Sequence, residues 1–157
     1  MNITTGPRGV LEINEARIIY RNFKGEQSQY NAKGDRNFAV IIPTEELANQ
    51  LIEDGWNVKI KDPREEGDTP FMFLPVKIKF NERGPHVYLT SGKSFNRLTE
   101  ETAGQIDDVK IVSCDMDIRP YDWEINGKCG RTAYLQSINV IQELDRFSRL
   151  MESYEEQ

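Results

Sequence analysis

The chain has 157 residues, about the length of one domain, of which 38% are hydrophobic and 29% are charged. Its 2 Trp, 6 Tyr and 7 Phe exclude a disordered chain, and no apolar run approaches the ~20 residues of a membrane span. The net charge of −6 excludes a uniformly basic surface, although residues 8–38 carry six basic against four acidic side chains, and residues 58–97 carry eight against five.

The first predicted strands flank a polar loop. Residues 10–23 are extended, and their second half alternates between two sides: Ala16, Ile18 and Tyr20 on one, and Arg17, Ile19, Arg21 and Phe23 on the other. A polar loop with glycines follows over residues 24–35. Residues 38–42 are all apolar and end at Pro43, which predicts a central strand.

Residues 44–54 predict a helix. Thr44 suits the N-cap, Glu45 and Glu46 favour the positive end of the helix dipole, and Gly55 supplies the stop. We expect its apolar stripe to consist of Leu47, Leu51 and Ile52.

Short strands are predicted next. Apolar and polar residues alternate over residues 58–61 and 76–80, on either side of an acidic loop rich in Pro and Gly at residues 62–70. Residues 87–90 predict another short strand, and residues 99–106 predict a helical turn. We expect Phe38 and Phe80 to lie in the core.

A long hairpin is predicted near the end of the chain. Its arms are residues 109–125 and 131–140, joined by residues 126–130, where Asn-Gly is a strong turn signal. Period-two alternation places Met116, Ile118 and Pro120 toward the interior, and Arg119, Tyr121 and Trp123 on the opposite face. Residues 142–157 have helical spacing at Leu144, Phe147, Leu150 and Met151 before an acidic end.

These elements predict an all-β protein with one or two helices. An OB-fold, a five-stranded Greek-key barrel with an inserted helix, fits best because it combines bent antiparallel strands with long functional loops. A β-sandwich is the alternative that periodicity does not separate from it. We expect residues 1–142 to form the barrel and residues 143–157 to form an acidic helical or flexible C-terminal tail.

Catalytic chemistry has little support in the sequence. His86 is the one histidine, and no nucleophile motif or phosphate-binding glycine loop occurs. With Cys114 and Cys129 as the two cysteines, we expect neither a disulfide framework nor a structural zinc site. Asp115 and Asp117 share a strand face that would suit Mg²⁺, but their position predicts ordinary solvent-facing acids. We therefore expect no cofactor, no metal and no enzymatic activity.

Basic and aromatic side chains interleave at outward-facing strand positions and in the adjoining loops. Single-stranded nucleic acid needs this mixture, because cations neutralise phosphates while aromatic rings stack any base. The predicted nucleic-acid-binding residues are Arg21, Phe23, Lys24, Tyr30, Arg36, Lys77, Lys79, Arg119, Tyr121, Trp123, Lys128, Arg131 and Tyr134.

A series of short motifs resembles one protein family in its order along the chain. The motifs are Arg21-Asn22-Phe23, Tyr30-Asn31, Gly34-Asp35-Arg36-Asn37-Phe38, the run from Leu51 to Val58, Ile118-Arg119-Pro120-Tyr121-Asp122-Trp123, Asn126-Gly127-Lys128 and Ala133-Tyr134-Leu135. From about Gly9 to Val140, the chain is similar to bacteriophage single-stranded DNA-binding proteins.

The resemblance implies an OB-fold that coats single-stranded DNA without sequence preference in phage replication and recombination, and that does not catalyse reactions. Its acidic end, residues 152–157, is similar in charge to tails that recruit replication or recombination proteins. Because residues 1–8 lack the apolar core of a signal peptide, we expect the host cytoplasm and no membrane. Oligomeric state is open between monomer and homodimer. A Mg²⁺-dependent phage nuclease or resolvase, and a protein-interaction adaptor, are the alternatives.

Overall fold

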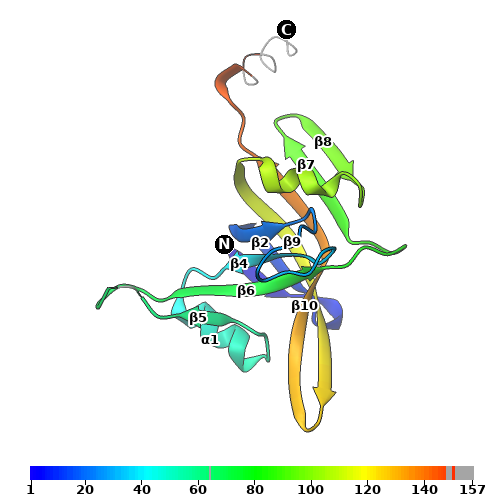
Figure 1. Ribbon diagram of the computed structural model, residues 1–157. Coiled ribbons are helices and arrows are strands. Elements are labelled where there is room, and N and C mark those ends of the chain that lie inside the picture. The colour runs from blue at the N-terminus through cyan, green and yellow to red at the C-terminus, as the bar shows by residue number, and fades with distance from the viewer. Residues whose placement is uncertain (64, 148–149, 151–157) are drawn as a thin grey trace.

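One strongly curved β-sheet runs through the computed structural model, which describes residues 1–63, 65–147 and 150 (Figure 1). Its strands are β1 (Asn2–Thr5), β2 (Leu11–Ala16), β3 (Ile18–Asn22), β4 (Arg36–Ile41), β5 (Lys59–Lys61), β6 (Phe71–Ile78), β7 (His86–Ser91), β8 (Ser94–Leu98), β9 (Ile111–Ile125) and β10 (Lys128–Gln142). The helix α1 (Glu45–Glu53) lies between β4 and β5, and the short 3-10 helices are η1 (Pro7–Gly9) and η2 (Ala103–Asp108).

The strands follow the order β1-β2-β9-β10-β6-β4-β3, with β5 added to β6, β7 added to β10, and β8 paired with β7. Strand β10 pairs in parallel with β6 and β7, and the other pairings are antiparallel. The predicted all-β class with an inserted helix is confirmed. The sheet does not close into a barrel, and it has more strands than the five of the predicted barrel, because residues 10–23 form two strands and β1 and β8 were not predicted. The strands form one sheet, which excludes the sandwich.

The hydrophobic core lies on the inner side of the curved sheet. Alternation along each strand supplies it, because every second side chain of a strand points to the same face. Its central members include Leu11, Ile13, Phe38, Val40, Leu74, Val76, Met116, Ile118, Leu135 and Ile138, each at most 4% exposed. Burying each such side chain contributes about 1.5–3 kcal/mol.

The predicted long strand over residues 10–23 is two strands, β2 and β3, that pair with different parts of the sheet. Tyr20 has a φ of 57°, and the register between β3 and β4 shifts between Ile19 and Asn22. Such a bulge reverses the alternation of side chains. Tyr20 is therefore 51% exposed and Phe23 is fully buried, the opposite of the predicted faces.

The prediction of Phe23 as a nucleic-acid contact is consequently wrong. Its ring stacks on Phe38 in the core, with ring centroids 5.4 Å apart and an angle of 9° between the planes. The carboxylate of Asp107 in η2 accepts hydrogen bonds from the backbone N–H groups of Phe23 (2.8 Å) and Lys24 (3.1 Å). A base cannot reach this ring without opening the core.

Helix α1 begins where the sequence predicts. The Oγ1 atom of Thr44 accepts a hydrogen bond from the backbone N–H of Leu47 at 3.2 Å, which confirms the N-cap. Leu51 and Ala48 are the buried positions of the helix, whereas Ile52, predicted to belong to the apolar stripe, is 42% exposed.

The predicted hairpin is confirmed, and its far half extends away from the rest of the sheet (Figure 1). Asn126 and Gly127 both have positive φ, 53° and 79°, as a two-residue hairpin turn of this kind requires. Residues 121–129 are all exposed, so the outer part of the hairpin lies in solvent on both faces.

Both cysteines are free thiols. Cys114 is buried in β9, and burial raises the pKa of its thiol to about 12. Cys129 is exposed in β10, two residues after the turn residue Gly127. Among the described residues, no helix is long and apolar enough to cross a membrane.

Replacing Phe23 by Ala should lower the free energy of unfolding by about 3–5 kcal/mol, because it leaves a cavity against Phe38. Urea denaturation followed by circular dichroism measures this loss. Tyr30→Ala is the control, since Tyr30 is 86% exposed and its removal should change stability by no more than about 0.5 kcal/mol. Equal stability of the two variants would contradict the buried position of Phe23.

Candidate nucleic-acid interface

The outer face of the sheet carries a row of polar and aromatic residues that crosses four strands. Asn37 in β4 lies opposite Lys77 in β6, Lys77 is paired with Tyr134 in β10, and Tyr134 lies opposite Arg119 in β9. Directly paired residues project to the same side of a sheet, a few ångströms apart. The register therefore brings together three predicted site residues that are far apart in sequence, namely Lys77, Arg119 and Tyr134.

The row continues along the hairpin. The guanidinium of Arg119 lies 5.4 Å from the ring centroid of Tyr134, and the ring of Tyr121 meets that of Tyr134 edge-on at 6.0 Å. Trp123, two residues farther along, lies on the same face. This confirms the prediction that Arg119, Tyr121 and Trp123 face away from the buried Met116 and Ile118.

Trp123 is paired with Gly130 across the hairpin, and its indole covers that glycine. A Cβ atom at Gly130 would lie 2.5 Å from the indole ring, so only glycine leaves room for the ring in this position. The indole is nevertheless 36% exposed. It packs on its own hairpin and is not a lid over the rim of the sheet.

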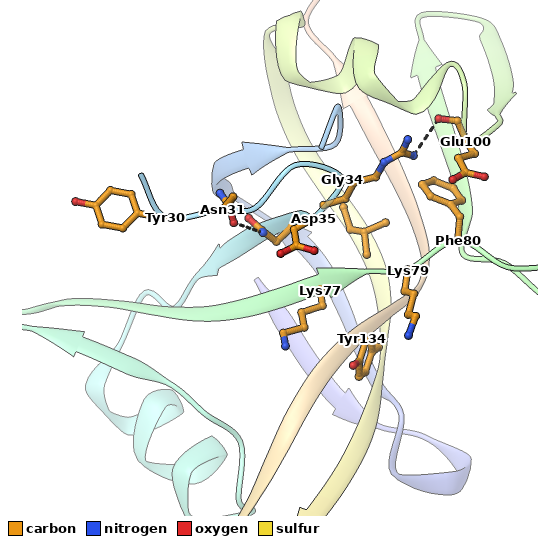
Figure 2. A pocket seen from close by; sticks show the side chains of 12 residues that line it. Tyr30, Asn31, Gly34, Asp35, Lys77, Lys79, Phe80, Glu100 and Tyr134 are labelled. Carbon is orange, nitrogen blue, oxygen red and sulfur yellow. Dashed lines mark hydrogen bonds between the residues drawn. The ribbon is translucent and has the colours of Figure 1, made fainter. Parts of the chain in front are cut away.

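A hollow of about 570 Å³, called here the Phe80 hollow, adjoins the row (Figure 2). It is lined by Tyr30, Asn31, Gly34, Asp35, Arg36, Asn37, Lys77, Ile78, Lys79, Phe80, Glu100 and Tyr134. Lys77 of β6 and Lys79, which follows the end of β6, extend on the side where the Tyr134 ring lies (Figure 2). Three further predicted residues, Tyr30, Arg36 and Lys79, thus meet Lys77 and Tyr134 at one place.

The electrostatic character of the Phe80 hollow is mildly positive. Arg36, Lys77 and Lys79 outnumber Asp35 and Glu100 by one charge. Arg36 is fixed, since its Nη1 donates to the backbone carbonyl of Glu100 at 3.0 Å. Within the described part of the chain, neither Lys77 nor Lys79 has an ion-pair partner, so both ammonium groups are available to phosphates.

Phe80 was expected in the core and instead lies half-buried at the edge of the hollow. The guanidinium of Arg36 lies 5.0 Å from its ring centroid. This contact holds a cation and an aromatic ring side by side, the pair of groups that a nucleotide needs.

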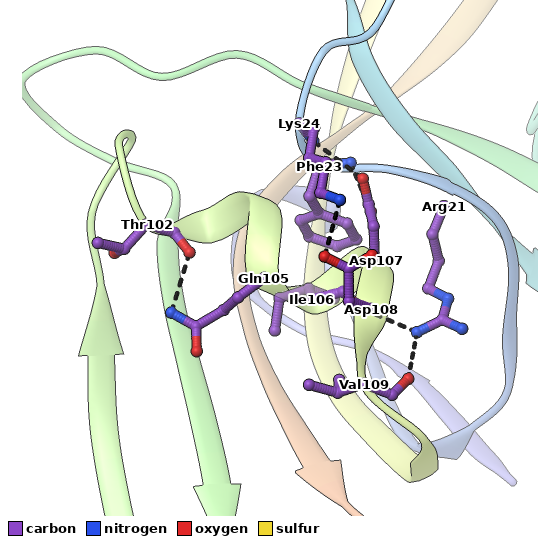
Figure 3. Close-up of polar contacts among 9 residues, drawn as sticks. All are labelled: Arg21, Phe23, Lys24, Thr102, Gln105, Ile106, Asp107, Asp108 and Val109. Atoms are coloured by element: carbon purple, nitrogen blue, oxygen red, sulfur yellow. Dashed lines mark hydrogen bonds and ion pairs between the residues drawn. The ribbon is translucent and has the colours of Figure 1, made fainter.

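Two predicted cations are engaged elsewhere (Figure 3). The Nη1 of Arg21 donates to the backbone carbonyls of Ile106 (2.7 Å) and Val109 (2.8 Å). The Nζ of Lys24 lies 2.7 Å from the carboxylate of Asp108, and this hydrogen bond raises the pKa of the Lys24 ammonium. These contacts hold the end of β3 and the segment after it against η2 and Val109, so they support a structural role and not the predicted contact with DNA.

Arg131 also differs from its prediction. It lies on the other face of the hairpin, where its Nε and Nη2 donate to the carboxylate of Asp122 at 2.7 and 3.3 Å. Its Nη1 donates to the backbone carbonyl of Asp54 at 2.7 Å, and its guanidinium lies 5.2 Å from the ring centroid of Trp56. Arg131 thereby fastens the hairpin to the end of α1. Lys128 is exposed beside the turn, and its pairing with Ile125 places it on the same face of the hairpin as Trp123.

The carboxylates considered for a metal site have other partners. Asp115 accepts a hydrogen bond from the backbone N–H of Glu15 at 2.9 Å, and Asp117 accepts one from the hydroxyl of Ser137 at 3.1 Å. Among the described residues, no three His, Cys, Asp or Glu side chains are grouped as metal ligands would be.

Sequence reasoning missed a second group on the outer face, formed by Tyr20, Lys61 and Phe73. The Nζ of Lys61 lies 5.4 Å from the ring centroid of Tyr20 and 5.6 Å from that of Phe73. The alternation of Lys59 and Lys61 with Ile60 was visible in the sequence. The outward position of Tyr20 was hidden, because it depends on the bulge in β3.

Several solved structures share this fold. A single-stranded DNA-binding protein from bacteriophage Enc34 matches with a TM-score of 0.58 at 12% identity, over 93% of this chain and 88% of that chain. Its C-terminally truncated form matches with a TM-score of 0.56 at 14% identity, over 92% of each chain. The same protein in complex with single-stranded DNA matches with a TM-score of 0.57 at 16% identity, over 93% of each chain. At these identities the likeness shows the fold, which is the predicted OB-fold. No curated protein sequence matches the chain.

An all-β sheet with stacking aromatics and lysines on one face is typical of OB-fold domains that bind oligonucleotides. The chain belongs to the family described as "Putative phage ssDNA-binding domain", whose model matches residues 4–154. The match begins in β1 and ends beyond β10, so the family predicted from short motifs is confirmed over nearly the whole chain.

Replacing Arg131 by Ala should loosen the hairpin, because it removes three hydrogen bonds to Asp122 and Asp54. We expect a loss of about 1–3 kcal/mol in the free energy of unfolding and faster amide hydrogen exchange in residues 121–132. Acidification should weaken the same contact, because Arg131 lowers the pKa of Asp122. The stabilisation that the ionised Asp122 carboxylate contributes is fully present above its unfolded-state pKa, and it is lost as the pH falls through its folded-state pKa.

Lys128→Ala is the matched control, since it removes a cation from the same hairpin without those partners. If Arg131→Ala left stability and exchange unchanged but weakened DNA binding, Arg131 would be a DNA contact and not an anchor.

Proposed function

We propose that the protein binds single-stranded DNA on the outer face of its sheet, without sequence preference, and coats exposed DNA during phage replication and recombination. One observation carries this proposal: the register aligns Lys77, Tyr134, Arg119 and the aromatic residues of the hairpin in one row beside the Phe80 hollow. Family membership supports it, as does the similar fold of a phage protein whose title names a complex with single-stranded DNA.

Stacking is the main source of affinity in this proposal. Each base stacked on an aromatic side chain contributes about 1–3 kcal/mol, and every base offers the same kind of ring face. Tyr121, Trp123 and Tyr134 supply rings along the row, and Tyr30 and Phe80 supply rings in the hollow. Binding through rings and ammonium groups is therefore independent of sequence.

Duplex DNA does not suit this surface. Bases within a duplex are already stacked and paired, so their faces cannot reach the rings of a sheet. Reading a duplex requires an element that enters a groove, usually a helix with basic side chains. Helix α1 carries no Lys or Arg, and its first turn contains Glu45 and Glu46.

The proposed activity is binding without turnover. Asp115 and Asp117, the residues that a Mg²⁺-dependent nuclease would use, are hydrogen-bonded within the sheet, so no observation favours that alternative. We place the activity in the host cytoplasm, because the family is a phage family. Recruitment of protein partners by the acidic tail stays a prediction, as does the domain boundary at residue 142. Most of the tail, residues 148–149 and 151–157, lies outside the described residues.

A titration with oligo-dT, followed by tryptophan fluorescence, tests this function, because the exposed Trp123 should respond to a stacked base while the buried Trp56 contributes a constant background. We expect a 30-nucleotide single strand to bind much more tightly than the matching duplex at the same salt concentration. Equal affinity for the two would contradict the proposal.

Salt dependence adds a control to the same titration. If three or four phosphates are neutralised, the logarithm of the affinity should fall against that of salt with a slope of roughly −2 to −3. The double variant Lys77→Ala and Lys79→Ala should reduce this slope by about 1.4, the value for two phosphates on a single strand.

Replacing Trp123 by Ala should weaken DNA binding by about 1–3 kcal/mol, because one stacked base is lost. The melting temperature should change little, since the indole is partly exposed and lies on the protruding part of the hairpin. Trp123→Phe should recover much of the affinity because it keeps an aromatic face. Normal DNA binding by a destabilised Trp123→Ala variant would instead assign the indole a packing role.

A further inference from the structure

A second hollow lies beside the Phe80 hollow and shares three of its lining residues, Tyr30, Asn31 and Asn37. Its volume is about 650 Å³. Its far wall is formed by Tyr20 and Phe73, and it is called here the Tyr20 hollow. Because the two hollows share these residues, a strand bound in one can continue into the other.

The Tyr20 hollow contains the groups that bind a nucleotide. The ring of Tyr20 meets the ring of Phe73 edge-on, with centroids 5.5 Å apart and an angle of 76° between the planes. The Nζ of Lys61 donates to the Tyr20 hydroxyl at 3.3 Å. Half of the Tyr20 surface remains exposed, so a flat ligand has access to its ring beside a cation.

The backbone is bent to produce this arrangement. Tyr20 has a φ of 57°, a left-handed conformation that is uncommon for a residue other than glycine and unfavourable for a bulky one. The bulge turns the Tyr20 ring out of the core, toward Phe73 and Lys61. A strained residue that exposes an aromatic side chain is a reason to look for a ligand.

The ridge between the two hollows is held in a fixed shape. The side-chain amide of Asn37 donates to the side-chain carbonyl of Asn31 at 2.6 Å. The amide of Asn22 donates to the backbone carbonyls of Glu26 and Asp35, both at 3.1 Å, and its carbonyl accepts from the backbone N–H of Glu26 at 2.9 Å. These bonds fix both ends of the loop after β3, so little ordering remains for the ligand to supply.

We propose that the Tyr20 hollow is a second base-stacking subsite of the same DNA-binding surface. One base stacks on Tyr20, Lys61 contacts a neighbouring phosphate, and the strand crosses the Asn31–Asn37 ridge to reach Lys77 and Phe80. This inference rests on the proposed function, and it defines where the path of the strand extends: from the hairpin across the sheet to the edge formed by β3.

A ladder of oligo-dT lengths from 3 to 16 nucleotides tests the subsite, since sites on OB-folds span about 4–16 nucleotides. Tyr20→Ala should weaken binding of the longer oligonucleotides by about 5- to 150-fold, which corresponds to one stacked base. It should leave unchanged the affinity of the shortest oligonucleotides that bind to the Phe80 hollow alone. Tyr20→Phe should behave like the wild-type protein.

Lys61→Ala provides a second variant on a different strand, β5, and it should show the same dependence on length. Phe95→Ala is the matched control, because Phe95 is an aromatic residue with 62% exposure on β8 and lies outside both hollows. Melting temperatures of all variants establish that they are folded.

Photo-crosslinking adds a direct readout. Oligo-dT carrying a single 5-iodouracil at either end should crosslink to a peptide that contains Tyr20 or Phe73, and mass spectrometry identifies the peptide. Wild-type binding with no effect of Tyr20→Ala at any length, or an equal loss at all lengths, would overturn the second subsite. Absence of binding by the wild-type protein would instead overturn the proposed function.

Discussion

The alternation of side chains along four strands in fixed register is the constraint on which the rest of this structure depends. In β4, β6, β10 and β9, one set of residues fills the core, and the set between them forms the outer row. Because the period of a strand is two, a slip of one residue would exchange the two sets. The buried Val76 and Ile118 therefore fix the outward position of Lys77 and Arg119 as firmly as they fix the core.

Short sequence patterns predict the hairpin, the two faces of β9 and the ends of α1. The Asn-Gly turn defines the hairpin, and alternation along residues 114–123 assigns the faces of β9 without knowledge of its partners. Thr44 and Gly55 likewise mark the ends of α1. In each case the information lies within a few residues of the position concerned, so one sequence is sufficient.

Three site predictions, Arg21, Lys24 and Arg131, differ from the structure for one reason, which is contact between distant parts of the chain. Arg21 and Lys24 meet η2 more than 80 residues away, and Arg131 meets the end of α1 77 residues away. From the sequence alone, a basic residue at an outward strand position is predicted to be free to bind phosphate. Only the folded structure shows the distant partner that it contacts instead. The bulge at Tyr20 belongs to the same class, because it arises from the pairing of β3 with β4 and moves Phe23 to the inside.

The two thiols differ in a way that makes the hairpin experimentally accessible. Cys114 is buried and stays protonated at neutral pH, since its pKa is about 12, so it does not react as a thiolate. Cys129 is exposed near the hairpin turn, and the sequence has no third cysteine. A maleimide dye added to the unmodified protein therefore labels one position, and it provides a spectroscopic reporter at the tip of the element whose aromatic face we assign to DNA.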